Sequence, residues 1–248
     1  MVLDFNIYNK TLSRLTIILF SLLFFSNADA QDPYVQGGFG MGTYYMQRLK
    51  DFEHGATNGS AIRMENVENF EPYWSYVLKG GKILEKKEIG SNLSFSSTGS
   101  RSAYEDYSGY IYFDQIVYGL SIGPYMNFLL RQKANSTFYF GLAANFITSY
   151  YKIKESNRIL DQEFSDVMGA WSIGGELGFN FSYRYDIHKF FVQPEAGLMI
   201  NVANSVLRTI EENQKIFYYS GSDQKALKVN WSGIRAFVSV GYYLKSKE

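Results

Sequence analysis

The sequence predicts an all-β protein, namely an eight-stranded antiparallel up-and-down transmembrane β-barrel preceded by a cleaved signal peptide. Three observations predict this fold class. The segment from Met168 to Tyr185 alternates strictly between large apolar and small polar residues, as a two-faced strand does. Similar segments recur along the chain, and the linkers between them alternate between long and short. The first thirty residues have the pattern of an export signal.

The alternation between 168 and 185 separates two chemically different faces. One face is large and apolar and consists of Trp171, Ile173, Gly175, Leu177, Phe179, Phe181 and Tyr183. The other is small and polar and consists of Ser172, Gly174, Glu176, Gly178, Asn180, Ser182 and Arg184. The water-facing side of a soluble sheet is normally rich in Lys, Glu, Asp and Thr, whereas small polar residues suit a crowded lumen. The pattern therefore favours a membrane barrel, with its apolar face toward lipid, over a soluble sheet.

The beginning of the chain reads as a targeting segment. Lys10 and Arg14 precede an apolar run from Leu15 to Phe25, and a small-x-small cleavage site follows at Ala28–Ala30. The run is shorter than the roughly 20 residues that a membrane-spanning helix needs. We therefore expect residues 1–30 to be a signal peptide and residues 31–248 to form the barrel domain.

Composition excludes several functional classes. Aromatic residues make up 18% of the chain and charged residues 19%, and the formal net charge is zero, so nothing favours binding to nucleic acid. The chain has no cysteine and only two histidines, which are far apart in sequence. Since metal sites are built from clusters of such ligands, we expect no metal ion and no cofactor.

Eight alternating segments are predicted as strands, and they fall at about 35–45, 73–83, 89–102, 115–128, 138–149, 168–185, 190–202 and 233–244. Long linkers are expected at 49–71, 102–110, 154–166 and 208–228, and short turns at 85–88, 131–136 and 186–189. A short helix is expected near Arg63 to Phe70. The apolar residues occupy odd-numbered positions before the turn at 186–189 and even-numbered positions after it, as a hairpin with an even-numbered loop requires. Short turns then lie on the periplasmic side, together with both ends of the barrel domain, and long loops lie outside.

Three charged residues fall on the expected lumen face near the middle of their strands: Glu176, Glu195 and Arg235. Buried charges need partners, so we expect Arg235 to pair with one or both carboxylates. Tyr44 and Phe237 are also assigned to the lumen. Such a cluster could serve as a gate for ions or as a polar plug. An eight-stranded barrel is just wide enough to be filled by its own side chains, which favours the plug.

The Gly-rich first strand, GGFGMGTYY at 37–45, and the terminal strand, GIRAFVSVGYYLK at 233–245, follow the export signal. With that signal they resemble the small eight-stranded outer-membrane barrels of the OmpX-like and OmpA-transmembrane-domain type, grouped with the porin or PorT-like families. The resemblance covers about 31–248. It implies a monomer in the outer membrane of a Gram-negative cell, in contact with outer-membrane lipid.

Three functions are compatible with such a barrel. The first is a non-enzymatic protein that displays the loops at 49–71, 154–166 and 208–228 for adhesion, envelope integrity or partner binding. The second is a lipid A-modifying enzyme, an acyltransferase or deacylase, that uses His54 with Ser165–Asp166 or Ser222–Asp223. The third is a secretion or transport accessory. An exposed loop histidine beside ordinary polar residues is the simpler interpretation of His54, which favours the first function.

Overall fold

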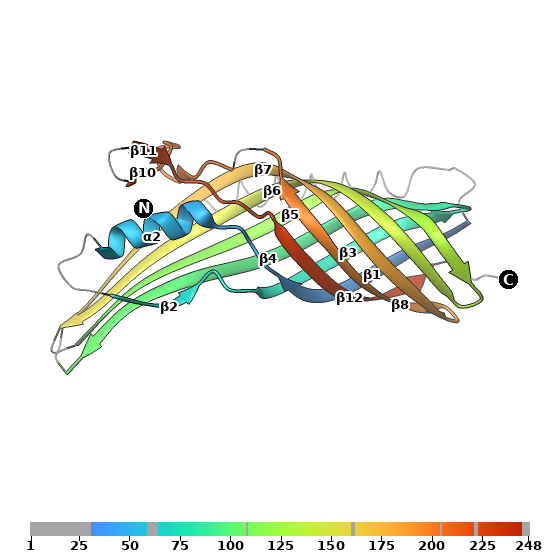
Figure 1. Cartoon of the computed structure of the whole chain (residues 1–248), viewed down its shortest axis with the longest axis horizontal. Coiled ribbons are helices and arrows are strands. Elements are labelled where there is room, and N and C mark those ends of the chain that lie inside the picture. Colours follow the sequence, from blue (N-terminus) through green and yellow to red (C-terminus); the bar gives the residue numbers. More distant parts are fainter. Residues whose placement is uncertain are drawn as a thin grey trace.

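Eight strands close on themselves into a barrel (Figure 1) in this computed structural model, which describes residues 31–58, 64–107, 109–159, 162–203, 205–220 and 223–244. The predicted signal peptide at 1–30 lies outside the described residues. In order around the ring the strands are β1 (Gln31–Gly42), β3 (Tyr73–Leu84), β4 (Lys87–Asp106), β5 (Gly109–Lys133), β6 (Ser136–Ile159), β7 (Gln162–Ile187), β8 (Phe190–Asn201) and β12 (Gly233–Tyr243). All neighbours pair antiparallel, and β12 closes onto β1. The predicted fold class is confirmed.

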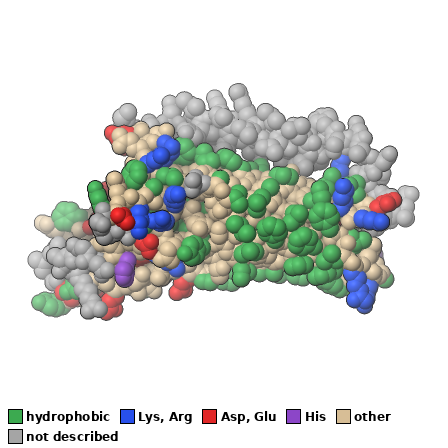
Figure 2. Space-filling model, turned by 45° about the horizontal axis from the view of Figure 1, so that its top comes forward, with side chains coloured by type: hydrophobic (Ala, Val, Ile, Leu, Met, Phe, Trp, Pro, Cys, Tyr) green, Lys and Arg blue, Asp and Glu red, His purple; other side chains and the backbone are tan. Residues whose placement is uncertain are grey.

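The alternation in the sequence corresponds to the two faces of the barrel wall. On β7, Leu177 is 41% exposed on the outside, whereas its neighbour Glu176 is 1% exposed in the lumen. The same alternation of exposed and buried positions runs through the middle of the other barrel strands. Figure 2 shows that hydrophobic side chains cover the middle of the wall, while Lys, Arg, Asp and Glu gather toward its ends.

Aromatic side chains border the outward apolar band at both ends, as in membrane barrels. Toward the short turns the exposed aromatics are Phe128, Phe138, Phe181, Tyr183, Tyr185, Phe190 and Tyr242. Toward the other end they are Tyr45, Trp74, Tyr76, Phe95, Tyr118 and Tyr150. Along β6 the stretch from Phe138 to Tyr150 covers about 27–33 Å of the barrel axis, given the rise per residue and the usual strand tilt. The band therefore matches the thickness of a membrane core.

The short turns lie where expected, between Leu84 and Lys87, Lys133 and Ser136, and Ile187 and Phe190. The prediction of long loops at 102–110 and 154–166 is wrong. Most of the first segment belongs to strands β4 and β5, and most of the second belongs to β6 and β7. These strands run on beyond the apolar band and project from one side of the barrel (Figure 1). Outside the membrane no lipid enforces alternation, and the first seven residues of β7, from Gln162, are all exposed. The backbone ladder continues where the sequence pattern ends.

The helix prediction is also wrong. Arg63 lies outside the described residues, and Glu65–Asn69 forms strand β2, which pairs with β4 although all five of its side chains are exposed. The helix is instead α2 (Gln47–Asn58). Met46, Leu49 and Glu53 are buried at helical spacing and turn one face of α2 toward the barrel.

A second segment, between β8 and β12, meets α2 at the end of the barrel opposite the short turns. It contains β9 (Arg208–Thr209), which pairs with β7, and a hairpin of β10 (Phe217–Ser220) and β11 (Asp223–Ala226). We call α2 and the described part of 205–231 the cap. Its buried apolar residues form one cluster with the mouth of the barrel, including Leu49, Ile147, Tyr151, Leu207, Leu227 and Trp231. Among the described residues, no helix is long and apolar enough to cross a membrane.

Candidate functional site

Three buried ion pairs cross the lumen: Arg184–Glu88, Lys79–Glu195 and Arg235–Glu176. None of the six residues is more than 9% exposed. The first pair joins β7 to β4 and the second joins β3 to β8, and in each case the two strands are three places apart around the ring. Bonds between such distant strands pass through the interior, so the lumen is bridged by side chains.

The three lumen charges expected from the sequence lie in the lumen but belong to two pairs. The Arg235 Nη2 lies 2.5 Å from Glu176 Oε1 and also donates a hydrogen bond to the Trp231 carbonyl oxygen at 3.2 Å. Glu195 instead accepts a hydrogen bond from the ammonium group of Lys79. The structure therefore joins Arg235 to one of the two carboxylates and gives the other a partner from β3.

The most buried pair, Arg184–Glu88, was not expected from the sequence. The sequence pattern places Glu88 in the short turn at 85–88, but it is fully buried on β4. It lies on the same face as Asn92, Ser94 and the following even-numbered residues, and this parity is the signal that could have identified it. The Arg184 guanidinium lies 4.1 Å from the Phe191 ring centroid and donates to Gln193 Oε1 at 2.9 and 3.1 Å.

Tyrosines surround this pair and fill the end of the lumen nearest the short turns. The hydroxyls of Tyr34 and Tyr125 lie 2.5 Å apart, and Tyr34 donates to Glu88 at 3.2 Å. Tyr34 packs edge-on against Phe191, and Tyr243 packs against the same ring. These contacts link strands from different sides of the barrel and fill the end of its lumen nearest the short turns.

The opposite end of the lumen is closed by Trp231 and the cap. The Trp231 indole donates to Ser149 Oγ at 2.8 Å and packs edge-on against Tyr44, with ring centroids 4.9 Å apart. The Tyr44 hydroxyl in turn lies 2.7 Å from Ser75 Oγ. The apolar core of the cap covers this layer, so both ends of the lumen are filled.

One carboxyl group is buried where α2 meets the barrel. Glu53 is 2% exposed, and its Oε1 accepts a hydrogen bond from Ser102 Oγ at 2.5 Å, while Oε2 has no partner among the described residues. Burial raises the pKa of Glu53, and the hydrogen bonds and nearby positive charges only partly oppose this effect. The docked cap therefore favours the protonated form of Glu53 more than water does.

We expect docking of α2 to depend on pH through Glu53. Because its pKa is raised on docking, its contribution to stability is complete below the ordinary value of 4.5 and is lost as the pH rises through the raised pKa. Glu53→Gln should therefore protect the α2 amides more than the parent at neutral pH and equally at pH 4. Hydrogen exchange, corrected for intrinsic rates, measures this. The exposed Glu212→Gln is the control, and parent protection that is independent of pH would contradict the prediction.

The histidine considered for catalysis has no catalytic partner in the described part of the chain. His54 is exposed on α2, and no hydrogen bond joins its imidazole to Ser165, Asp166 or Asp223. Ser222 lies outside the described residues. No three His, Asp or Glu side chains in the described ranges are grouped as a metal site would require.

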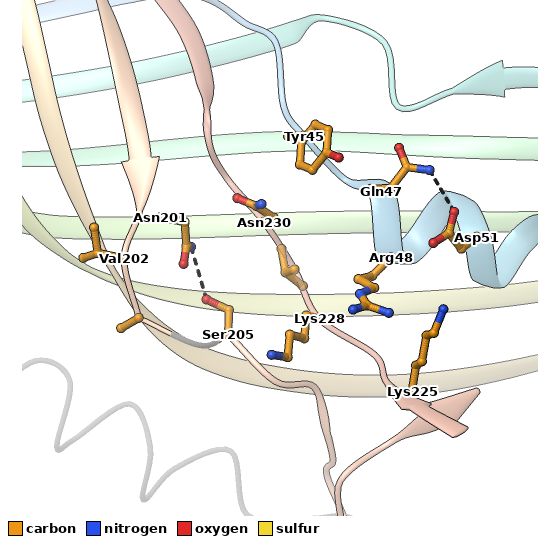
Figure 3. Close-up of a pocket in the computed structure, with 12 residues that line it drawn as sticks. Tyr45, Gln47, Arg48, Asp51, Asn201, Val202, Ser205, Lys225, Lys228 and Asn230 are labelled. Carbon is orange, nitrogen blue, oxygen red and sulfur yellow. Dashed lines mark hydrogen bonds between the residues drawn. The ribbon is translucent and has the colours of Figure 1, made fainter. Parts of the chain in front are cut away.

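A polar groove of about 540 Å³ lies at the rim of the barrel, between the start of α2 and the end of β8 (Figure 3). We call it the rim groove, and its lining includes Tyr45, Gln47, Arg48, Asp51, Asn201, Val202, Ser205, Lys225, Lys228 and Asn230. Three of these side chains are cationic and one is anionic. Among the lining side chains that the structure describes, cations therefore outnumber carboxylates.

The closed ring of eight antiparallel strands, with an apolar outer band and a polar lumen, decides the fold. This is the fold of the small outer-membrane β-barrels. Among solved structures, the chain is similar to the outer membrane protein OprG from Pseudomonas aeruginosa, at 13% identity over 88% of this chain and 97% of that one, with a TM-score of 0.43. It is also similar to Neisserial surface protein A, at 12% identity over 87% and 99% of the two chains, with a TM-score of 0.39.

A third similar structure is the outer membrane protease OmpT from Escherichia coli, at 9% identity over 87% of this chain and 98% of that one, with a TM-score of 0.41. No family model and no curated protein sequence matches the chain. At identities of 9% to 13% these likenesses concern the fold alone and assign no activity.

Proposed function

We propose that the protein is a non-enzymatic barrel of the outer membrane that displays its cap at the cell surface for partner binding. The observation that carries the proposal is the filled lumen. Ion pairs, tyrosines and the apolar cap occupy it from one end to the other. A polar plug of this kind holds the barrel together rather than gating ions.

The absence of a catalytic arrangement in the described residues supports the non-enzymatic proposal. A lipid A-modifying enzyme would need a nucleophile and a base within hydrogen-bond reach, and His54 makes no such contact with a described serine or carboxylate. A secretion or transport accessory would share the same fold, and no feature of the lumen favours it over display.

The end of the barrel that carries the cap is the part that we propose to be displayed. Of the three segments expected as loops, 49–71 and 208–228 contribute the helix, short strands and turns of the cap, and 154–166 forms the projecting β6–β7 hairpin. Adhesion and envelope integrity are both served by a rigid surface of this kind. In this proposal the wall contacts outer-membrane lipid and the barrel acts as a monomer.

A single-cysteine experiment tests the display, since the natural chain contains no cysteine. Asp223→Cys places a thiol in the exposed cap, and Lys189→Cys places one in an exposed short turn. A maleimide that cannot cross membranes should label Asp223→Cys in intact cells, and Lys189→Cys only after lysis. The opposite pattern, or labelling of neither residue before lysis, would contradict the proposed orientation.

A further inference from the structure

The rim groove exists because the barrel wall divides near its edge. Pairing between β8 and β12 ends at Met199 and Gly233. Beyond that point Val202 bonds to Gly175 on β7, while Ser232 continues the pairing with β1 through Tyr45. The backbone ladder divides here, the Asn201 N–H donates to Ser232 Oγ at 2.8 Å as a last link between the two sides, and the groove lies at this fork.

The outward side of the fork has the chemistry of the lipid-facing wall. Tyr45 and Val202 line the groove and are 60% and 57% exposed. Val202 continues the outward face of Leu198 and Ile200, and Tyr45 lies at the height of the outer aromatic ring. Such aromatic rings mark the level of lipid headgroups in a membrane. The groove is therefore open to the side, toward the headgroup layer, and not only to the medium above.

The inner side of the fork carries the cations. Figure 3 shows Arg48 reaching from the first turn of α2 toward the segment that carries Lys225 and Lys228. All three cationic residues are half-buried. Arg48 donates to the Tyr218 hydroxyl at 3.4 Å and forms no ion pair with a described carboxylate.

The one acidic residue of the groove is already engaged by neighbouring donors. Asp51 Oδ1 accepts a hydrogen bond from Gln47 Nε2 at 2.8 Å, and Oδ2 accepts one from the Tyr218 hydroxyl at 3.4 Å. The neutral amides of Asn201 and Asn230 add donors to the lining. The groove thus offers positive charge and hydrogen-bond donors to a ligand that is itself anionic.

We propose that the rim groove binds the phosphorylated headgroup of an outer-leaflet lipid, whose acyl chains lie along the apolar wall below it. Exposed apolar residues of β8 and β12, Leu198, Ile200, Ile234 and Val238, provide that wall. A basic pocket at headgroup height beside an apolar surface is the arrangement that recognises anionic lipid. The inference rests on the proposed function, in which the cap faces the cell exterior, and the cysteine labelling tests that orientation separately.

Native mass spectrometry of protein refolded in neutral detergent tests the proposal. The probes are lipid A as the phosphorylated lipid, phosphatidylcholine as a lipid without net charge, and glucose 1-phosphate as a soluble phosphate. We expect the parent to retain one lipid A in preference to either control. The triple variant Arg48→Gln/Lys225→Gln/Lys228→Gln should bind lipid A about 100-fold more weakly, since each of the three surface cations contributes roughly five-fold.

Two further variants separate the groove from general charge. The triple variant Lys133→Gln/Lys152→Gln/Lys154→Gln removes as many cations outside the groove and should bind lipid A like the parent. Asp51→Asn removes the only carboxylate among the described lining residues and should bind lipid A several-fold more tightly. All variants are first checked for the change in gel migration on boiling that a folded barrel shows. Equal retention of lipid A by both triple variants would overturn the proposal, and so would preferential binding of glucose 1-phosphate.

Discussion

Arg184→Ala is expected to lower the free energy of unfolding by about 3–5 kcal/mol, the cost of leaving one member of a buried ion pair without its partner. Arg184 and Glu88 are 1% and 0% exposed. The substitution leaves the Glu88 carboxylate inside the lumen with neutral donors such as Tyr34 and Asn127. It also removes the contacts of the guanidinium with three aromatic rings. Equilibrium denaturant titration of the barrel in lipid vesicles measures the effect.

Two control variants identify the cause of that loss. Arg184→Met/Glu88→Leu removes both charges and should cost less than the single substitution, because no uncompensated charge remains. Arg101→Ala breaks an exposed pair with Asp114, in which the arginine side chain is 47% exposed, and should cost at most about 1 kcal/mol. A loss below that level for Arg184→Ala, or equal losses for the single and double variants, would show that the pair is not a main support of the lumen.

Glu176→Lys is expected to destabilise the barrel by about 3–5 kcal/mol, because it places a second cation beside Arg235 in a buried position. The adjacent Leu177→Arg should cost about 2–4 kcal/mol, because Leu177 faces lipid near the middle of the band. Glu176→Gln keeps a hydrogen-bond acceptor for Arg235 and is the matched control, with a smaller loss.

The two positions together test the assignment of the faces. If the barrel were soluble with an apolar core, Glu176 would meet water and Glu176→Lys would be harmless, whereas Leu177→Arg would be severe. Folding titrations in lipid vesicles separate the two cases. A Glu176→Lys variant that folds as well as the parent would mean that Glu176 does not lie in a closed lumen.

The membrane-spanning part of the fold could be predicted because lipid acts on one face of every strand. On β7 this gives the clear alternation of Leu177, Phe179 and Phe181 with small polar residues, and the prediction is confirmed. Outside the band, the first seven residues of β7 are all exposed, and no alternation marks them as a strand. Helix α2 was missed because its buried face is short and includes a charged residue, Glu53, in place of an apolar one.

The partners inside the lumen follow from long-range geometry that alternation does not contain. Alternation along the strands places Arg235 and Glu195 on the inner face of the barrel. The tilt and stagger of the strands decide which inner residues meet across the lumen. Lys79 lies on a strand with weak alternation and reaches Glu195 three strands away. The rim groove likewise depends on where the pairing of β8 and β12 ends, which no local pattern in the sequence specifies.

Single-channel recording in planar lipid bilayers tests the central claim, that the barrel is closed by its own side chains. Three ion pairs, the tyrosines near the short turns and the cap occupy the lumen. The account therefore predicts no steady conductance steps after insertion of the folded parent protein. Insertion is verified by the boiling-dependent gel migration of protein recovered from the same lipid. Reproducible conductance steps that scale linearly with voltage would contradict the account.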